Sequence, residues 1–271
     1  MLFELMQYYC DQNVIKDNQS SINDVLLHES CTFANECWVN MDEKKRGYNK
    51  IQFPYVGAKY LTSKTKLLVM GLNLYEHGGW NSLRKDLLNV QFALYKKWKR
   101  IRLGNLVENY PGTIFWHRVA VYSSVILKQL GYHKIKDDLS NDFDGLANVI
   151  DKISFIEAVK CSPHDPNSRS APTSTMKTNC QKAFLAKEIK VLSPDYLLIL
   201  GKETLVDNDT IQKEITLTSS EGNIYFGYVS INQEKFRFFQ VIHPTALGGS
   251  DREIIPEFEN LVKKVFTHLQ T

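Results

Sequence analysis

The stretch SFIEAVKCSPHDPNSRSAPTSTMKTNCQKAFLAKEIKVLSPDYLLILG, residues 154–201, decides the fold of this chain. Its first part, SFIEAVKC at 154–161, is a short apolar run that predicts a buried strand. NCQKAFLAKEIKVLSP at 179–194 has the apolar spacing of an amphipathic helix that Pro194 ends. DYLLILG at 195–201 predicts a second strand. Strand, helix and strand in this order indicate a βαβ unit, whose two strands run parallel.

The rest of the chain extends the same alternation. We predict strands in KLLVMGLN (66–73), NIYFGYVSI (223–231) and KFRFFQVIHP (235–244), and helices in FWHRVAVYSSVILKQLGY (115–132) and EIIPEFENLVKKVFTHLQ (253–270). The expected fold class is α/β, a three-layer α/β/α sandwich on a mostly parallel central sheet. We expect a single domain over residues 1–271, with a helical, cysteine-bearing lead-in at about residues 1–60. Functional loops are expected at the carboxyl ends of the strands.

Composition narrows the class of protein but does not fix it. The 33 basic and 30 acidic residues leave a formal net charge of +3, which is compatible with a nucleic-acid partner. Basic and aromatic residues alternate over residues 84–102, as in a segment that tracks phosphates, or equally in a helix with a solvated basic face. No apolar run is long enough to span a membrane and no basic segment opens a signal peptide, so we expect a cytoplasmic protein.

Short polar motifs stand at the ends of three expected strands. Gly71-Leu72-Asn73-Leu74-Tyr75 follows the first strand, residues 157–161 close the second, and His243-Pro244-Thr245 follows the last. A further pattern runs through the βαβ unit: Lys160-Cys161, Pro163, Arg169, Pro172, Cys180, Leu185, Glu188-Ile189, Pro194 and Gly201.

In this order the motifs resemble those of the uracil-DNA glycosylase superfamily, closest to its iron–sulfur-bearing, family 4-like branch with an Asn-type water-positioning motif. The resemblance covers roughly residues 31–249. It implies a monofunctional DNA glycosylase, an enzyme that flips a damaged or modified pyrimidine from DNA and hydrolyses its bond to the sugar, leaving an abasic site. Leu74 departs from the family, which usually has proline there.

The resemblance assigns roles to individual side chains. Asn73 would hold the attacking water, and His243 would donate a hydrogen bond to the base as negative charge develops on it. Tyr75 would screen C5 of the pyrimidine. Trp80 or Phe115 would stack on the flipped base, and the sequence does not choose between them.

Glu157 is the informative departure. Counting back from Lys160-Cys161, the family carries here the asparagine that reads the pairing edge of uracil. An ionised carboxylate accepts from an exocyclic amino group but cannot donate to uracil O4, so we expect a cytosine-type base, such as a modified cytosine in phage DNA. A protonated Glu157 could also donate, and a Glu157 directed to solvent would read nothing.

The resemblance also implies a metal centre and a DNA surface. Cys31, Cys37, Cys161 and Cys180 would bind a 4Fe-4S cluster, with zinc or four buried thiols as alternatives, and the chemistry would not require it. DNA is the expected partner of a monomeric protein, contacted through Arg169, Ser170, Thr245, Leu247 and Gly248, with Leu247 as a wedge. The competing interpretation is a catalytically weak nucleic-acid-binding relative with the same fold.

Overall fold

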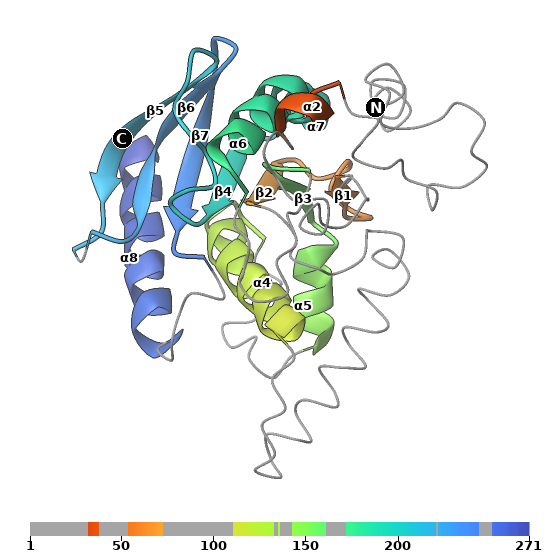
Figure 1. Ribbon diagram of the computed structural model, residues 1–271. Coiled ribbons are helices and arrows are strands. Elements are labelled where there is room, and N and C mark those ends of the chain that lie inside the picture. The colour runs from red at the N-terminus through yellow and green to blue at the C-terminus, as the bar shows by residue number, and fades with distance from the viewer. Residues whose placement is uncertain are drawn as a thin grey trace.

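The computed structural model describes residues 32–37, 54–72, 111–132, 135, 143–160, 172–220, 222–243 and 251–270. Its fold is α/β, with a mixed sheet of seven strands accompanied by helices (Figure 1). No helix in these residues is both long and apolar enough to cross a membrane.

The strands are β1 (Tyr55–Val56), β2 (Leu67–Gly71), β3 (Ile153–Glu157), β4 (Tyr196–Leu200), β5 (Ile211–Thr218), β6 (Tyr225–Ile231) and β7 (Glu234–Val241). The helices are α2 (Ala34–Cys37), α4 (Pro111–Gln129), α5 (Phe143–Ile150), α6 (Ser174–Cys180), α7 (Ala186–Leu192) and α8 (Asp251–Gln270), with a π-helical turn, η4 (Gln181–Leu185), between α6 and α7.

The strand order across the sheet is β1-β3-β2-β4-β7-β6-β5. The four central strands, β3, β2, β4 and β7, are parallel, and β1, β6 and β5 pair antiparallel with their neighbours. β6 and β7 form a hairpin closed by Asn232 and Gln233, whose φ angles are 47° and 71°. Positive φ at both central residues is what a two-residue turn between twisted strands requires.

The central strands β2, β3 and β4 are buried on both faces, and each face packs on its own helices. One apolar cluster joins alternate strand residues such as Leu67, Val69 and Phe155 to side chains of α4, α5 and α8. The other joins the intervening residues, among them Leu68 and Met70, to side chains of η4 and α7. Burial on both faces explains why the central strands are continuous apolar runs.

The structure departs from the sequence-based expectation outside the central strands. β5, α5 and β1 were not predicted, and β6 and β7 form an antiparallel hairpin where a mostly parallel sheet was expected. The expected lead-in is not entirely helical, because Tyr55 and Val56 pair with β3. The helix expected at 179–194 begins earlier, at Ser174, where the Thr173 side chain caps it by accepting from the Met176 N–H.

α6 and α7 are joined by a π-helical turn and not by a loop. η4 inserts a π-helical turn directly after Cys180, and α7 ends at Leu192 with Ser193 in the left-handed conformation (φ 47°) before Pro194. π-helical turns inside α-helices are frequent at functional sites. Figure 1 shows α2 beside α6, and the two helices are in contact.

Candidate functional site

The candidate site lies where the four parallel strands end. Gly71 of β2 is in register with Glu157 of β3, and Leu200 of β4 with Val241 of β7, so the carboxyl ends of all four strands reach the same edge. Backbone hydrogen bonds continue the β2–β3 pairing one step further, from the Ala158 N–H to the Gly71 carbonyl and onward. This edge therefore carries the segments in which the sequence places its polar motifs.

The topology marks a particular point on this edge. From β2 the chain crosses to β3 on one side, through α4 and α5, and from β4 it passes to β7 on the other side. β2 and β4 are neighbours whose connections diverge, and ligands of open α/β sheets bind in the crevice outside such a switch point. β2 ends here at Gly71, between Glu157 at the end of β3 and the end of β4.

Glu157 packs against the backbone of Gly71. A Cβ atom on Gly71 would lie 2.5 Å from Glu157 Oε2 and 2.9 Å from Phe155 Cζ, closer than real Cβ atoms approach. Only glycine therefore leaves room for the carboxyl group in this position. Glu157 is 1% exposed, which excludes the solvent-directed orientation that the sequence left open.

The surroundings of Glu157 favour its protonated form. Burial raises the pKa of the Glu157 carboxyl well above its usual value, Lys160 acts in the opposite direction, and Glu188 adds to the rise. Lys160 itself is bound to Glu188, with 2.7 Å between Nζ and Oε2. Oε2 of Glu157 has no hydrogen-bond partner among the described residues, which makes it a candidate for binding a ligand.

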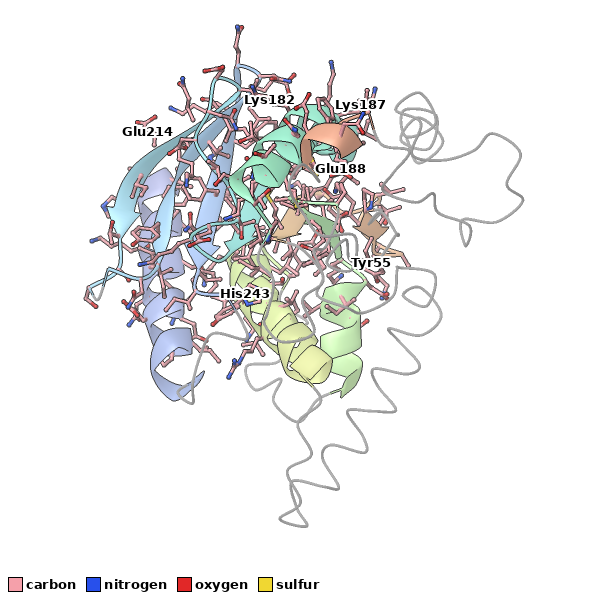
Figure 2. The ribbon with its side chains drawn as sticks, in the orientation of Figure 1. Tyr55, Lys182, Lys187, Glu188, Glu214 and His243 are labelled. Carbon is pink, nitrogen blue, oxygen red and sulfur yellow. The ribbon has the colours of Figure 1, made fainter. Side chains whose placement is uncertain are left out.

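His243 follows β7 and lies against the end of β4. Gly201 has a φ of +99°, and a Cβ atom there would lie 3.4 Å from His243 Cβ and 3.4 Å from Thr204 Oγ1. The Gly201 N–H donates to the Val241 carbonyl at 2.8 Å, which joins the two strand ends. The His243 side chain is labelled in Figure 2. Burial lowers the pKa of His243, so its imidazole is neutral at neutral pH.

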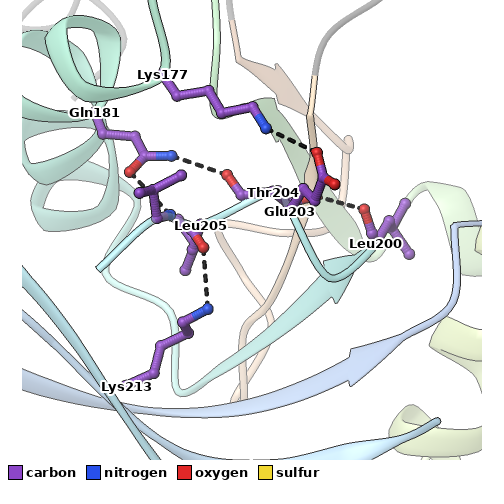
Figure 3. A network of polar contacts seen from close by, with 8 residues as sticks. Lys177, Gln181, Leu200, Glu203, Thr204, Leu205 and Lys213 are labelled. Carbon is purple, nitrogen blue, oxygen red and sulfur yellow. Dashed lines mark hydrogen bonds and ion pairs between the residues drawn. The ribbon is translucent and has the colours of Figure 1, made fainter. Parts of the chain in front are cut away.

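The loop after β4 is fixed by hydrogen bonds to the helical segment. Gln181 donates through Nε2 to the Thr204 carbonyl at 2.9 Å and accepts from the Val206 N–H at 3.3 Å (Figure 3). Thr204 Oγ1 donates to the Leu200 carbonyl at 2.6 Å. Lys177 of α6 forms an ion pair with Glu203 at 3.0 Å. The loop after β4, which contacts His243 through Gly201, is thus hydrogen-bonded to η4, the turn that follows Cys180.

Two of the four predicted cysteine ligands come from neighbouring helices. Cys37 of α2 and Cys180 of α6 are both buried. Asn179 Nδ2 donates to Glu36 Oε2 at 2.9 Å and lies 3.7 Å from Cys37 Sγ, which joins α2 to the residue preceding Cys180. Within the described ranges no group of three metal-binding side chains occurs, since Cys31 and Cys161 fall outside them.

Most of the other predicted site residues fall outside the described part of the chain. These are Asn73, Tyr75, Trp80, Arg169, Ser170, Thr245, Leu247 and Gly248, together with the side chain of Phe115 at the start of α4. Among the described candidates, the structure brings Glu157 and His243 to one edge of the sheet.

Two residues of the site carried a signal that sequence analysis noted without using. Glu188 stands among Leu185, Ile189 and Leu192 on the apolar stripe of its helix, where a carboxylate must be buried and therefore paired. Lys160, in the apolar run that ends β3, is its partner. Gln181 and Thr204 gave no such signal, because a π-helical turn and a loop contact have no sequence pattern of their own.

Comparison with known proteins adds no relatives: the chain matches no protein-family model and no curated protein sequence. The chemistry of this edge therefore follows from its own residues.

Proposed function

We propose that the chain is a monofunctional DNA glycosylase of the uracil-DNA glycosylase type, acting on a flipped pyrimidine at the carboxyl edge of the sheet. The observation that carries the proposal is the position of two residues at the same edge of the sheet, on either side of the switch point: a buried Glu157, whose Oε2 has no hydrogen-bond partner among the described residues, and His243, whose pKa is lowered by burial. The three-layer α/β/α arrangement expected from the sequence belongs to this proposal, and the separate apolar clusters on the two sheet faces support it.

The spacing of the two groups suits a nucleobase. Three strand intervals separate β3 from β7, so the two backbones lie about 14 Å apart at the usual distance between neighbouring strands. One pyrimidine lying across the ends of β2 and β4 would come within reach of both side chains. Glu157 would contact N3 and the substituent at C4, and His243 would contact O2 at the other end of the pairing edge.

The reaction needs a water molecule and a stabilised leaving group. Asn73 would align the water with C1′ of the sugar, the new bond would form from the water oxygen to C1′, and the bond from C1′ to the base nitrogen would break. The electron pair of that bond leaves with the base, and the water proton is released. A neutral His243 suits the role of hydrogen-bond donor to the developing negative charge at O2, because a ring nitrogen that carries a proton needs no net charge to donate.

The remaining expectations are part of the same proposal. Tyr75 would screen C5, and Trp80 or Phe115 would stack on the base. Arg169, Ser170, Thr245 and Gly248 would contact DNA, with Leu247 filling the space of the flipped nucleotide. The burial of Cys37 and Cys180 on joined helices fits a four-cysteine iron–sulfur cluster, which would fasten α2 and residues 161–171 beside the site.

Excision assays test the proposal directly. The protein is incubated with single- and double-stranded oligonucleotides that each contain one uracil, cytosine, 5-hydroxymethylcytosine or glucosylated 5-hydroxymethylcytosine, and alkali then cleaves any abasic site. We expect strand breaks at a modified pyrimidine, and a decrease of about 10²–10³-fold in the His243→Ala variant, as when a donor to a developing anion is removed. Asn73→Ala is expected to lose about 10²-fold or more, because the water loses its alignment.

A matched control is available on the surface of the sheet. Glu214 of β5 is exposed and paired with Lys235, so Glu214→Gln repeats the chemical change of Glu157→Gln away from the site and should leave excision unchanged. Absence of breaks in every oligonucleotide contradicts the proposal. Retained DNA binding without excision would then favour the catalytically weak binding relative.

A further inference from the structure

Three ionisable side chains are buried together behind the candidate site. Lys160 Nζ lies 2.7 Å from Glu188 Oε2, and the two side chains are 1% and 0% exposed. Glu157 is the last residue of β3, three residues before Lys160, and is 1% exposed. Among the described residues, Lys160 is the one cation that acts on both of these buried carboxyl groups, through the ion pair with Glu188 and electrostatically on Glu157.

Counted over the described residues, the charges of Glu157, Lys160 and Glu188 balance only if one carboxyl group keeps its proton. Glu188 and Lys160 neutralise each other in a direct ion pair. An ionised Glu157 would add a net negative charge, and its Oε2 finds no hydrogen-bond donor in the described part of the chain. A buried charge without a donor or counter-ion is strongly disfavoured, and such a group takes up a proton instead.

We propose that Glu188, by neutralising Lys160, keeps Glu157 a neutral carboxylic acid, and that this acid reads the pairing edge of the flipped base as donor and acceptor at once. The second part rests on the proposed function. Glu188 and Lys160 act here as positioning residues, since neither is assigned a contact with the base. Without Glu188, the Lys160 ammonium would draw the proton off Glu157.

A neutral Glu157 implies a broader class of substrate bases than an ionised Glu157 does. A neutral carboxyl group has one O–H donor and one carbonyl acceptor side by side. Uracil offers N3–H and O4, and cytosine offers N3 and the N4 amino group, so the acid complements either edge once its proton is on the appropriate oxygen. The site would therefore accept uracil-type and cytosine-type bases alike. Discrimination against ordinary cytosine would fall to contacts at C5, where Tyr75 is expected.

Within the described residues, two charged groups act on the Glu157 carboxyl. Lys160 acts from the segment that follows β3, and Glu188 acts from α7. β2 contributes the backbone of Gly71, which carries no charge, and Phe155 contributes an apolar ring. Removal of the Lys160 charge should therefore raise the pKa of Glu157, and removal of the Glu188 charge should lower it.

Carbon-13 NMR of glutamate labelled at Cδ measures the proton on Glu157 without any substrate. The Glu157→Gln variant identifies its signal, and the full-length protein is titrated between about pH 5 and about pH 9. We expect the wild-type Glu157 carboxyl to remain protonated at neutral pH. In Glu188→Gln, the uncompensated Lys160 should make Glu157 release its proton at least about one pH unit lower, a tenfold change in proton affinity. A wild-type signal that is ionised over the whole range overturns the proposal.

A second variant guards against loss of folding in Glu188→Gln. Lys160→Met/Glu188→Met removes the whole pair, and such replacements by apolar residues are often tolerated. Glu157 should keep its proton in this double variant, because no cation is left unpaired. If Glu157 titrates identically in Glu188→Gln and in the double variant, the unpaired charge of Lys160 does not cause the change in its pKa, and the proposal is overturned.

Excision assays separate this inference from the proposed function. Wild-type excision should fall as pH rises through the titration of Glu157, and Glu157→Gln, whose amide donates and accepts at every pH, should lose this fall. If the wild type cleaves no oligonucleotide, the proposed function fails while the NMR titration still decides the state of Glu157. If it cleaves them with Glu157 ionised, the inference fails and the proposed function stands.

Discussion

Replacement of Gly71 by alanine should disturb the Glu157 carboxyl before it disturbs anything else. The new Cβ would lie 2.5 Å from Oε2 and 3.0 Å from Cδ of Glu157, and 2.9 Å from Phe155 Cζ. Overpacking of this kind destabilises proteins by about 1–3 kcal/mol. Alanine offsets part of this, about 0.5–1 kcal/mol, because it loses less backbone entropy than glycine in a strand. We therefore expect Gly71→Ala to lower the free energy of unfolding by about 1–2 kcal/mol.

A double-mutant cycle with Glu157→Ala assigns this loss to its cause. Removal of the carboxyl group abolishes two of the three close contacts and leaves only Phe155 Cζ. Gly71→Ala should then cost about 1 kcal/mol less in the Glu157→Ala background than in the wild type. Urea unfolding followed by circular dichroism gives the four free energies. Additivity within about 0.5 kcal/mol would refute the reasoning, because residues in contact do not add.

Three further outcomes follow from buried groups. Lys160→Met leaves Glu188 buried without its cation and should destabilise the protein by about 3–5 kcal/mol, whereas the double replacement of Lys160 and Glu188 by methionine should cost far less in the same urea titration. The raised pKa of Glu157 stabilises the folded protein fully below the unfolded pKa of about 4.3, and this stabilisation is lost as pH rises toward the folded pKa. Between these two pKa values, the free energy of unfolding of the wild type should therefore fall relative to that of Glu157→Gln, by at most about 1.4 kcal/mol per pH unit. Parallel curves of unfolding free energy against pH for the two proteins would contradict this. Purified protein should absorb near about 400 nm and contain iron, both lost in Cys180→Ser and kept in Cys10→Ser, while a colourless, iron-free wild type would exclude the cluster.

The central strands could be predicted from the sequence because both sheet faces are buried. LLVMG and YLLIL are apolar throughout, and ISFIE is apolar apart from Ser154 and Glu157; such runs have few alternatives to a parallel strand between two layers. β5 has the opposite character. Its sequence IQKEITLT lies at the edge of the sheet with most side chains exposed, so it carries no apolar run and resembles a loop.

The candidate site was predictable in its place along the chain but not in its chemistry. The carboxyl ends of parallel strands follow from the strand assignments alone, which located Glu157 and His243. Burial is the main cause of the raised pKa of the Glu157 carboxyl, and the two charged groups that adjust this pKa include Glu188, which is 31 positions away in the sequence. No local pattern encodes that interaction, and the expectation of an ionised carboxylate selective for cytosine-type bases changes with it.

The extra residue in η4 has a consequence for how this region tolerates change. A single residue corresponds to about 100° of rotation in an α-helix, so the halves before and after the π-helical turn are out of phase by roughly that angle. Deletion of one residue within 181–185 would restore ordinary helical geometry locally, yet would swing Glu188 away from Lys160 relative to Cys180 and Gln181. The number of residues in this segment therefore sets the relative orientation of its two halves, so that Gln181 faces the loop after β4 while Glu188 faces Lys160.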